Sequence, residues 1–159
     1  MKYLFLAMFT LVFNSHNKNI LVQNSFANWR NANLNDKIKS NKMKLKIGSD
    51  IFIATLYDNE TTVALKAMLP LTLNMTELNG NEKYNQLSAD LPTSTAGIGT
   101  IREGDLMLWG ANTFVLFYKT FKTTYRYTRL GHIDNPRGLA SAVGSGSVTI
   151  CLSAEQKTE

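Results

Sequence analysis

The segment at residues 110–134 reads GANTFVLFYKTFKTTYRYTRLGHID. Its aromatic and β-branched residues after a glycine-containing turn are typical of a β-hairpin. No acidic residue occurs between Asp105 and Asp134, so a ligand would meet aromatic area and positive charge. Six rings and four cations alternate along the ribbon: Phe114, Phe117, Tyr118, Phe121, Tyr125 and Tyr127, with Lys119, Lys122, Arg126 and Arg129.

Strand parity divides these rings between two faces. Phe114 and Tyr118 share one face of the first strand, and Val115 and Phe117 share the other. In a closed barrel one set must fill the core, so we expect half of the aromatic residues to serve packing. The turn at 121–124 and the outward-facing residues after it remain for binding.

The net charge of +5 comes from the start of the chain. The whole chain contains 17 basic and 12 acidic residues, and residues 1–42 contain six of the basic residues and one of the acidic residues. The remainder therefore has 17 − 6 = 11 basic and 12 − 1 = 11 acidic residues. The folded part is therefore neutral, and its charge does not indicate a nucleic-acid partner.

The first 42 residues are expected to lie outside the folded domain. Lys2 and the apolar run at 3–13 are typical of a signal peptide, which we place at 1–27, and they fall short of a membrane span. The asparagine-rich segment 28–42 is interpreted as a flexible tether. Export, most simply to the periplasm, follows from this interpretation. The alternative is a cytoplasmic protein whose true start is Met43.

From residue 43 the pattern predicts a mainly β fold, a small closed barrel of about eight strands with two short helices. Residues 88–103, which contain Pro92 and two glycines, are expected to form a long loop. The domain is assigned to 43–153, and 154–159 is a tail. The expected strands are 43–48, 51–57, 71–75, 82–87, 104–109, 113–119, 125–133 and 148–152.

Both helices have recognisable start signals. Asp58 or Asn59 is expected to cap the first helix, which Pro70 ends. Asp134 before Asn135-Pro136 is expected to cap the second. The apolar face of the first helix is expected to contain Val63, Ala64, Ala67 and Met68.

The order of these elements resembles the cyclophilin barrel, and more specifically the bacterial cyclophilin-like domains, which are distinct from true cyclophilins. The resemblance covers about 110 residues and is carried by several motifs in combination. These are MKLKIGSDIFIATLYDN at 43–59, AMLPLTLNM at 67–75, LNGNEKY at 78–84, Leu91-Pro92, Gly104-Asp105-Leu106, NTFVLFYKTF at 112–121 and TRLGHIDNPRGLA at 128–140.

The resemblance implies a pocket at the barrel rim. Cyclophilins isomerise prolyl peptide bonds with an arginine, a glutamine amide and several rings. Asn112 takes the place of the glutamine, Phe114 that of a pocket phenylalanine, Phe121 that of the tryptophan and Tyr127 that of the histidine. Arg129 adds a guanidinium that suits a peptide or a small anionic ligand.

The cyclophilin arginine is missing from this chain. Its expected place is the loop around Ser94, and no basic residue occurs from Tyr84 to Ile101. Arg102 is too close to Gly104-Asp105 to replace it. We therefore expect a site that binds a small molecule or a peptide without catalysing a reaction. A prolyl isomerase of exported proteins and a structural or interaction domain are the alternatives.

Other polar residues are expected to have ordinary roles. Glu77 and Glu82 flank a turn and are interpreted as solvated charges. His132 is two residues from Asp134, but no suitable serine accompanies them, so a catalytic triad is not expected. Cys151 is interpreted as a packed thiol. No metal site or cofactor is expected, since the domain has one histidine and one cysteine.

Overall fold

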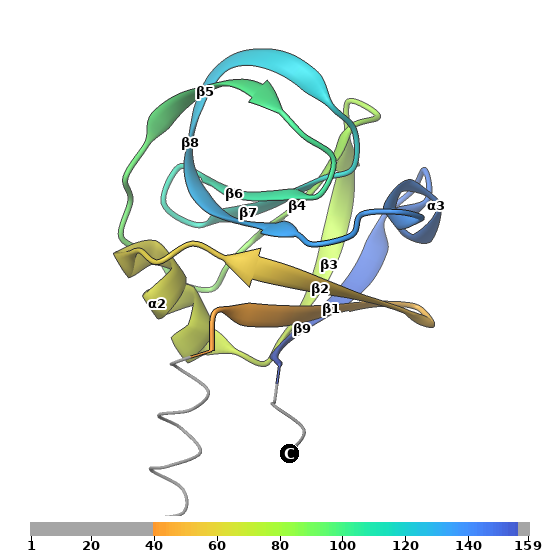
Figure 1. Cartoon of the computed structure of the whole chain (residues 1–159), viewed down its shortest axis with the longest axis horizontal. Coiled ribbons are helices and arrows are strands. Elements are labelled where there is room, and N and C mark those ends of the chain that lie inside the picture. Colours follow the sequence, from red (N-terminus) through yellow and green to blue (C-terminus); the bar gives the residue numbers. More distant parts are fainter. Residues whose placement is uncertain (1–39, 156–159) are drawn as a thin grey trace, which may run out of the picture. The chain divides into compact units, whose positions relative to one another are not determined.

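A closed antiparallel barrel of eight strands dominates residues 40–155, the part of the chain that the computed structural model describes (Figure 1). The predicted signal peptide and most of the tether lie outside the described residues. The strands are β1 Lys42–Ile47, β2 Asp50–Leu56, β3 Leu71–Leu78, β4 Glu82–Gln86, β5 Ala96–Ile101, β6 Asp105–Trp109, β7 Thr113–Phe117, β8 Phe121–Ile133 and β9 Val148–Ala154. The helices are α2 Glu60–Met68 and α3 Leu139–Val143.

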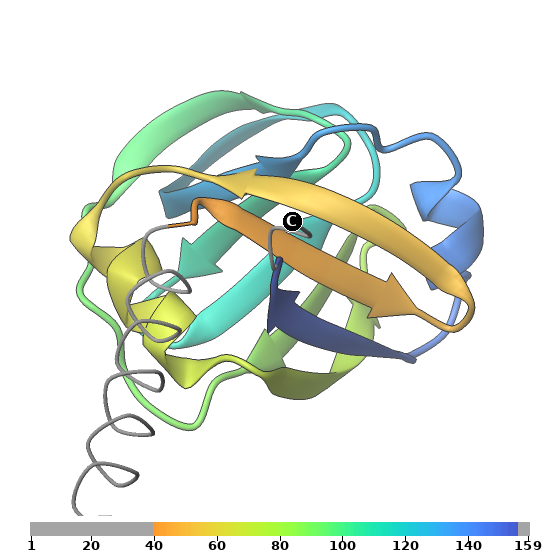
Figure 2. The same ribbon diagram turned by 60° about the horizontal axis from the view of Figure 1, so that its bottom comes forward.

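The barrel closes where β8 pairs with β2. The strands follow the order β2-β1-β9-β3-β4-β7-β6-β8, and the register of the closing pair sets Leu56 opposite Gly131 and Ala54 opposite Ile133. β1 lies between β2 and β9 on the side that Figure 2 brings forward. The predicted mainly β fold, a closed barrel of about eight strands with two short helices, is confirmed.

The loop predicted at 88–103 is wrong in its second part, because residues 96–101 form a ninth strand, β5. Residues 96–101 pair with the first half of β8, and the register shifts between Gly97 and Gly99. β8 begins at Phe121, earlier than predicted, and its length of 13 residues lets its second half stay in the barrel. Its first half and β5 form an arch above β4, β6 and β7 (Figure 1).

Two apolar clusters lie on opposite faces of the sheet. The barrel interior holds Phe114 and Tyr118, as parity suggested. Beneath the arch a second cluster contains Ile101, Met107, Val115, Phe117 and Tyr127. Every residue of β7 is therefore buried, because the arch covers the face that an isolated barrel would leave to solvent.

Helix α2 begins at Asn59, one of the two predicted caps. The Asn59 side chain accepts a hydrogen bond from the Thr62 amide at 2.9 Å, and the Thr62 hydroxyl accepts one from the Asn59 amide at 3.4 Å. The predicted apolar face is right in part: Ala64 and Met68 pack against the core, but Val63 and Ala67 are exposed, and the buried residues of the helix are Thr61, Thr62 and Leu65. The Thr61 hydroxyl donates to the Pro92 carbonyl at 2.7 Å, so the first turn packs on the loop before β5.

Helix α3 begins after Gly138 rather than at Asp134. The Asp134 carboxylate instead accepts hydrogen bonds from the Lys42 ammonium, at 2.7 Å, and from the Thr55 hydroxyl. The predicted cap is therefore wrong, because Asp134 is used to join β1 and β2 to the end of β8.

Candidate functional site

A hollow of about 490 Å³ lies at one edge of the arch, between the turn that joins β3 to β4 and the first half of β8. Its walls combine aromatic rings with polar side chains from the turn. The rings belong to Phe121, Tyr125 and Tyr127, and the polar side chains from the turn and the start of β4 are Asn79, Asn81 and Glu82.

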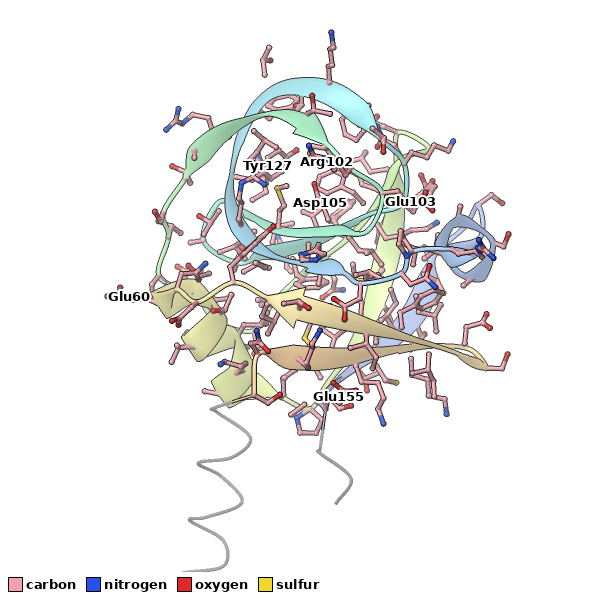
Figure 3. The ribbon with its side chains drawn as sticks, in the orientation of Figure 1. Glu60, Arg102, Glu103, Asp105, Tyr127 and Glu155 are labelled. Carbon is pink, nitrogen blue, oxygen red and sulfur yellow. The ribbon has the colours of Figure 1, made fainter. Side chains whose placement is uncertain are left out.

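The rings of Phe121 and Tyr127 are fixed by the second apolar cluster. The centroid of Phe117 lies 5.7 Å from that of Phe121 and 5.6 Å from that of Tyr127, with the latter pair perpendicular. Such edge-to-face contacts stabilise aromatic pairs beyond simple burial. Tyr127 lies within the arch (Figure 3) and is 6% exposed, whereas Tyr125 is 67% exposed. The hollow thus has a rigid inner wall and a solvent-facing outer ring.

The hydroxyl of Tyr127 stays protonated at neutral pH. Burial, followed by the negative charge of Glu82 and by Tyr125, raises the pKa of Tyr127 to about 12. Within residues 40–155 this hydroxyl makes no side-chain hydrogen bond with another residue. It is therefore a free donor beside the hollow.

Glu82 places a carboxyl at the inner side of the hollow. It is the first residue of β4 and lies opposite Phe117, so the two side chains share the face beneath the arch. Glu82 is only 9% exposed, and no residue in the described part of the chain forms an ion pair or hydrogen bond with its carboxyl. Burial and the charge of Glu77 raise the pKa of Glu82.

The neighbouring Lys83 does not neutralise Glu82, because adjacent strand residues point to opposite faces. Lys83 is fully buried, and its ammonium donates to the Glu77 carboxylate and to the carbonyls of Gly144, at 2.8 Å, and Gly146, at 2.6 Å. Glu77 also accepts from the Tyr118 hydroxyl at 2.9 Å. The prediction that Glu77 and Glu82 are solvated charges is therefore wrong.

The structure brings two of the five predicted rim residues to the hollow, Phe121 and Tyr127. Phe114 is fully buried inside the barrel, on the opposite face of β7. Asn112 is half-buried in the turn between β6 and β7, where its carbonyl accepts from the Leu87 amide at 2.8 Å. Arg129 is half-buried in β8, opposite Met107.

Sequence reasoning did not assign Asn81 and Glu82 to the site. The Oδ1 atom of Asn81 is buried and has no hydrogen-bond partner among the described residues. A usable signal was the alternation of the predicted strand at 82–87, which sets Glu82 and Tyr84 on one face. That face becomes enclosed only when the arch forms, which the sequence pattern did not predict.

The remaining polar candidates lie on the outer surface. The His132 Nε2 atom is 4.0 Å from Asp134 Oδ1, and both side chains are exposed. Cys151 is exposed rather than packed, with its sulfur 3.8 Å from the Thr72 hydroxyl oxygen. Within residues 40–155, no group of three or more His, Cys, Asp or Glu side chains could hold a metal ion. The same residues contain no helix long and apolar enough to cross a membrane.

The closed barrel with its two helices defines the class of protein, and comparisons with known proteins agree. The model of the Cyclophilin-like family matches residues 45–153, and this chain belongs to that family. A hypothetical protein of Archaeoglobus fulgidus, solved in solution, shares the fold with a TM-score of 0.50 and 16% identity, over 72% of this chain and 94% of that one. No curated protein matches the chain significantly.

Proposed function

We propose that this protein binds a small molecule or a short peptide segment in the hollow beside Phe121 and Tyr127, without catalysing a reaction. The volume of about 490 Å³ falls within the usual range of ligand sites, about 300–1,000 Å³. The observation that carries the proposal is the pairing of aromatic walls with two acceptors that have no partner among residues 40–155, the buried Oδ1 atom of Asn81 and the carboxyl of the 9% exposed Glu82. Buried polar groups are normally hydrogen-bonded, so unpartnered ones indicate a place for a ligand.

The proposal modifies the rim expected from the sequence. Phe121 and Tyr127 are kept as ring contacts. Arg129 shares the strand face of Tyr127, two residues away, and remains a candidate contact at the far end of the arch. Phe114 and Asn112 are left out, since one fills the barrel core and the other belongs to the β6–β7 turn.

The test is an NMR titration of the ¹⁵N-labelled domain with a library of small molecules and short peptides. We expect amide shifts confined to 79–82 and 121–127, together with a raised melting temperature, because a ligand that binds only the native state stabilises it. Phe121→Ala should abolish both effects. Tyr57→Ala, which removes an exposed ring outside the hollow, should preserve them. Shifts centred elsewhere, or none, would contradict the proposal.

A protease-coupled assay on a short proline peptide addresses the isomerase alternative. We expect no rate above background, because no basic residue occurs from 84 to 101, where the cyclophilin arginine would be. A rate above background that collapses in Phe121→Ala would overturn the binding-only proposal in favour of catalysis.

Export is part of the same proposal and is supported by the leader sequence. Lys2 followed by the apolar run at 3–13 suits a signal peptide ending near Ala27. N-terminal sequencing of the mature protein from fractionated cells should give a start after residue 27 in the exported fraction. A cytoplasmic protein that begins at Met43 would contradict export.

A further inference from the structure

We propose that the hollow selects ligands that carry an alkylammonium group, whose charge is taken by the carboxylate of Glu82. The inference rests on the proposed function, binding in this hollow, and adds the chemical class of the ligand. It follows from the charge and hydrogen-bonding capacity that the hollow presents.

Glu82 is the first reason. The residue is only 9% exposed, yet no cation of residues 40–155 lies within ion-pairing distance of its carboxyl. A buried carboxylate without a partner costs free energy, and proteins normally pair it or coordinate it. The adjacent Lys83 is fully committed on the other face of β4, to Glu77 and two backbone carbonyls. No cation of residues 40–155 is placed to pair with Glu82, so a cation for this carboxylate would come from a ligand.

Asn81 is the second reason, and it is independent of the first. Its Oδ1 atom is buried without a donor among the described residues, and Asn81 is one of the residues that line the same hollow. The Glu82 carboxylate and this amide oxygen are both acceptors. An ammonium group offers three donors and no acceptor, so it matches both atoms, whereas a carboxylate or phosphate ligand would match neither.

The aromatic wall is the third reason. Phe121, Tyr125 and Tyr127 line the hollow with π faces and apolar edges. Cations are attracted to aromatic faces, and the interaction strengthens where water is excluded. The same rings would contact the methylene groups that carry the ammonium, so the hollow suits an amine with an apolar stem.

The only cationic residue among the described residues that line the hollow is Lys122. It is exposed, and no ion pair joins it to Glu82 or to another described carboxylate. Its charge at the mouth is screened by water, whereas Glu82 acts in a partly desolvated setting.

The experiment compares a cation with its neutral isostere at pH 8, to favour the carboxylate form of Glu82. The probes are N-acetyl-lysine N-methylamide, N-acetyl-norleucine N-methylamide and butylamine, titrated by NMR against the ¹⁵N-labelled domain. We expect the lysine probe to bind at least tenfold more tightly than the norleucine probe, with amide shifts in 79–82 and 121–127. Glu82→Gln should remove this preference. Glu60→Gln, which changes an exposed carboxyl on α2 (Figure 3), should keep it.

The outcomes separate the two proposals. Equal affinity for the lysine and norleucine probes, or a preference that survives Glu82→Gln, overturns the inference and leaves ligand binding in place. Absence of shifts with both amines overturns it as well, and the library titration then decides the proposed function separately. Within a positive result, tighter binding of the capped lysine than of butylamine assigns the site to a lysine side chain of a peptide, and the reverse assigns it to a free amine.

Discussion

Closure of the barrel depends on the absence of a side chain at Gly131. A Cβ atom at this position would lie 2.3 Å from the carbonyl oxygen of Thr55 and 2.9 Å from the Cα of Leu56. Both are backbone atoms of β2, so no side-chain rotation relieves the contact. Gly131→Ala therefore has to move β2 and β8 apart.

The size of this movement gives the cost. To restore an ordinary contact of 3.4 Å, the strands must separate by about 1 Å, since 3.4 − 2.3 = 1.1 Å. The hydrogen bonds on either side, from the Tyr57 amide to Leu130 and from the Asp134 amide to Ile53, are both 2.9 Å long and would stretch. Two lost bonds at about 1 kcal/mol each and overpacking of about 1–3 kcal/mol together destabilise the domain by about 3–5 kcal/mol.

Urea and thermal denaturation of the purified domain measure this loss. At about 4 °C per kcal/mol for a domain of this size, the melting temperature should fall by roughly 12–20 °C. Gly97→Ala is the matched control, because this strand glycine has an ordinary φ and nothing within 4 Å of its added Cβ. A Gly131→Ala variant within about 1 kcal/mol of the control would refute the reasoning on barrel closure.

Two further predictions concern buried and bridging charges. Lys83→Met should destabilise the fold by about 3–5 kcal/mol in urea denaturation, because it leaves the Glu77 carboxylate and two backbone carbonyls without their donor. Adding Glu77→Gln to this variant should recover part of the lost stability. No recovery would contradict the ion-pair explanation. Burial opposes ionisation of Asp134, but hydrogen bonds from Lys42 and Thr55 outweigh it and lower the pKa of Asp134. The stability that ionised Asp134 contributes is therefore present above its pKa in the unfolded chain, about 4, and is lost as the pH falls through its pKa in the folded protein. The difference in unfolding free energy between wild type and Asp134→Asn should accordingly narrow between pH 6 and pH 3. A difference that widens on acidification would show that the sign is wrong.

The sequence predicted the elements whose residues alternate clearly. Leu45 and Ile47 are buried with lysines between them, and the Asn59 cap marked the start of α2. β5 could not be predicted in this way, because Gly97 and Gly99 contribute no side-chain pattern. β5 forms because the first half of the long strand β8 offers it a pairing edge. That partner lies farther along the chain, so the local periodicity of residues 96–101 does not reveal it.

The residues that line the candidate hollow were less visible in the sequence than the fold, and the reason is the same arch. Phe121 and Tyr127 could be selected because rings near a turn are candidates in any context. Glu82 could not, because its burial is a tertiary effect: the carboxyl is enclosed only after β5 and β8 fold over β4. Phe114 was placed at the rim by matching strand positions, but the register sends its side chain into the barrel.

The arch also explains why binding is expected on the outside of the barrel. The interior is filled by large side chains, including Phe114 and Leu116, so it has no room for a ligand. On the outer face the arch encloses Phe117 and Tyr127, and Glu82, the first residue of β4, lies opposite Phe117 and lines the hollow beside the β3–β4 turn. A carboxyl placed at the end of an apolar cover is desolvated on one side and accessible on the other. The accessible side lets water solvate the charge when no ligand is bound, and the desolvated side strengthens its attraction for a bound cation. The Glu82→Gln titration measures how much this attraction contributes to the affinity for an ammonium ligand.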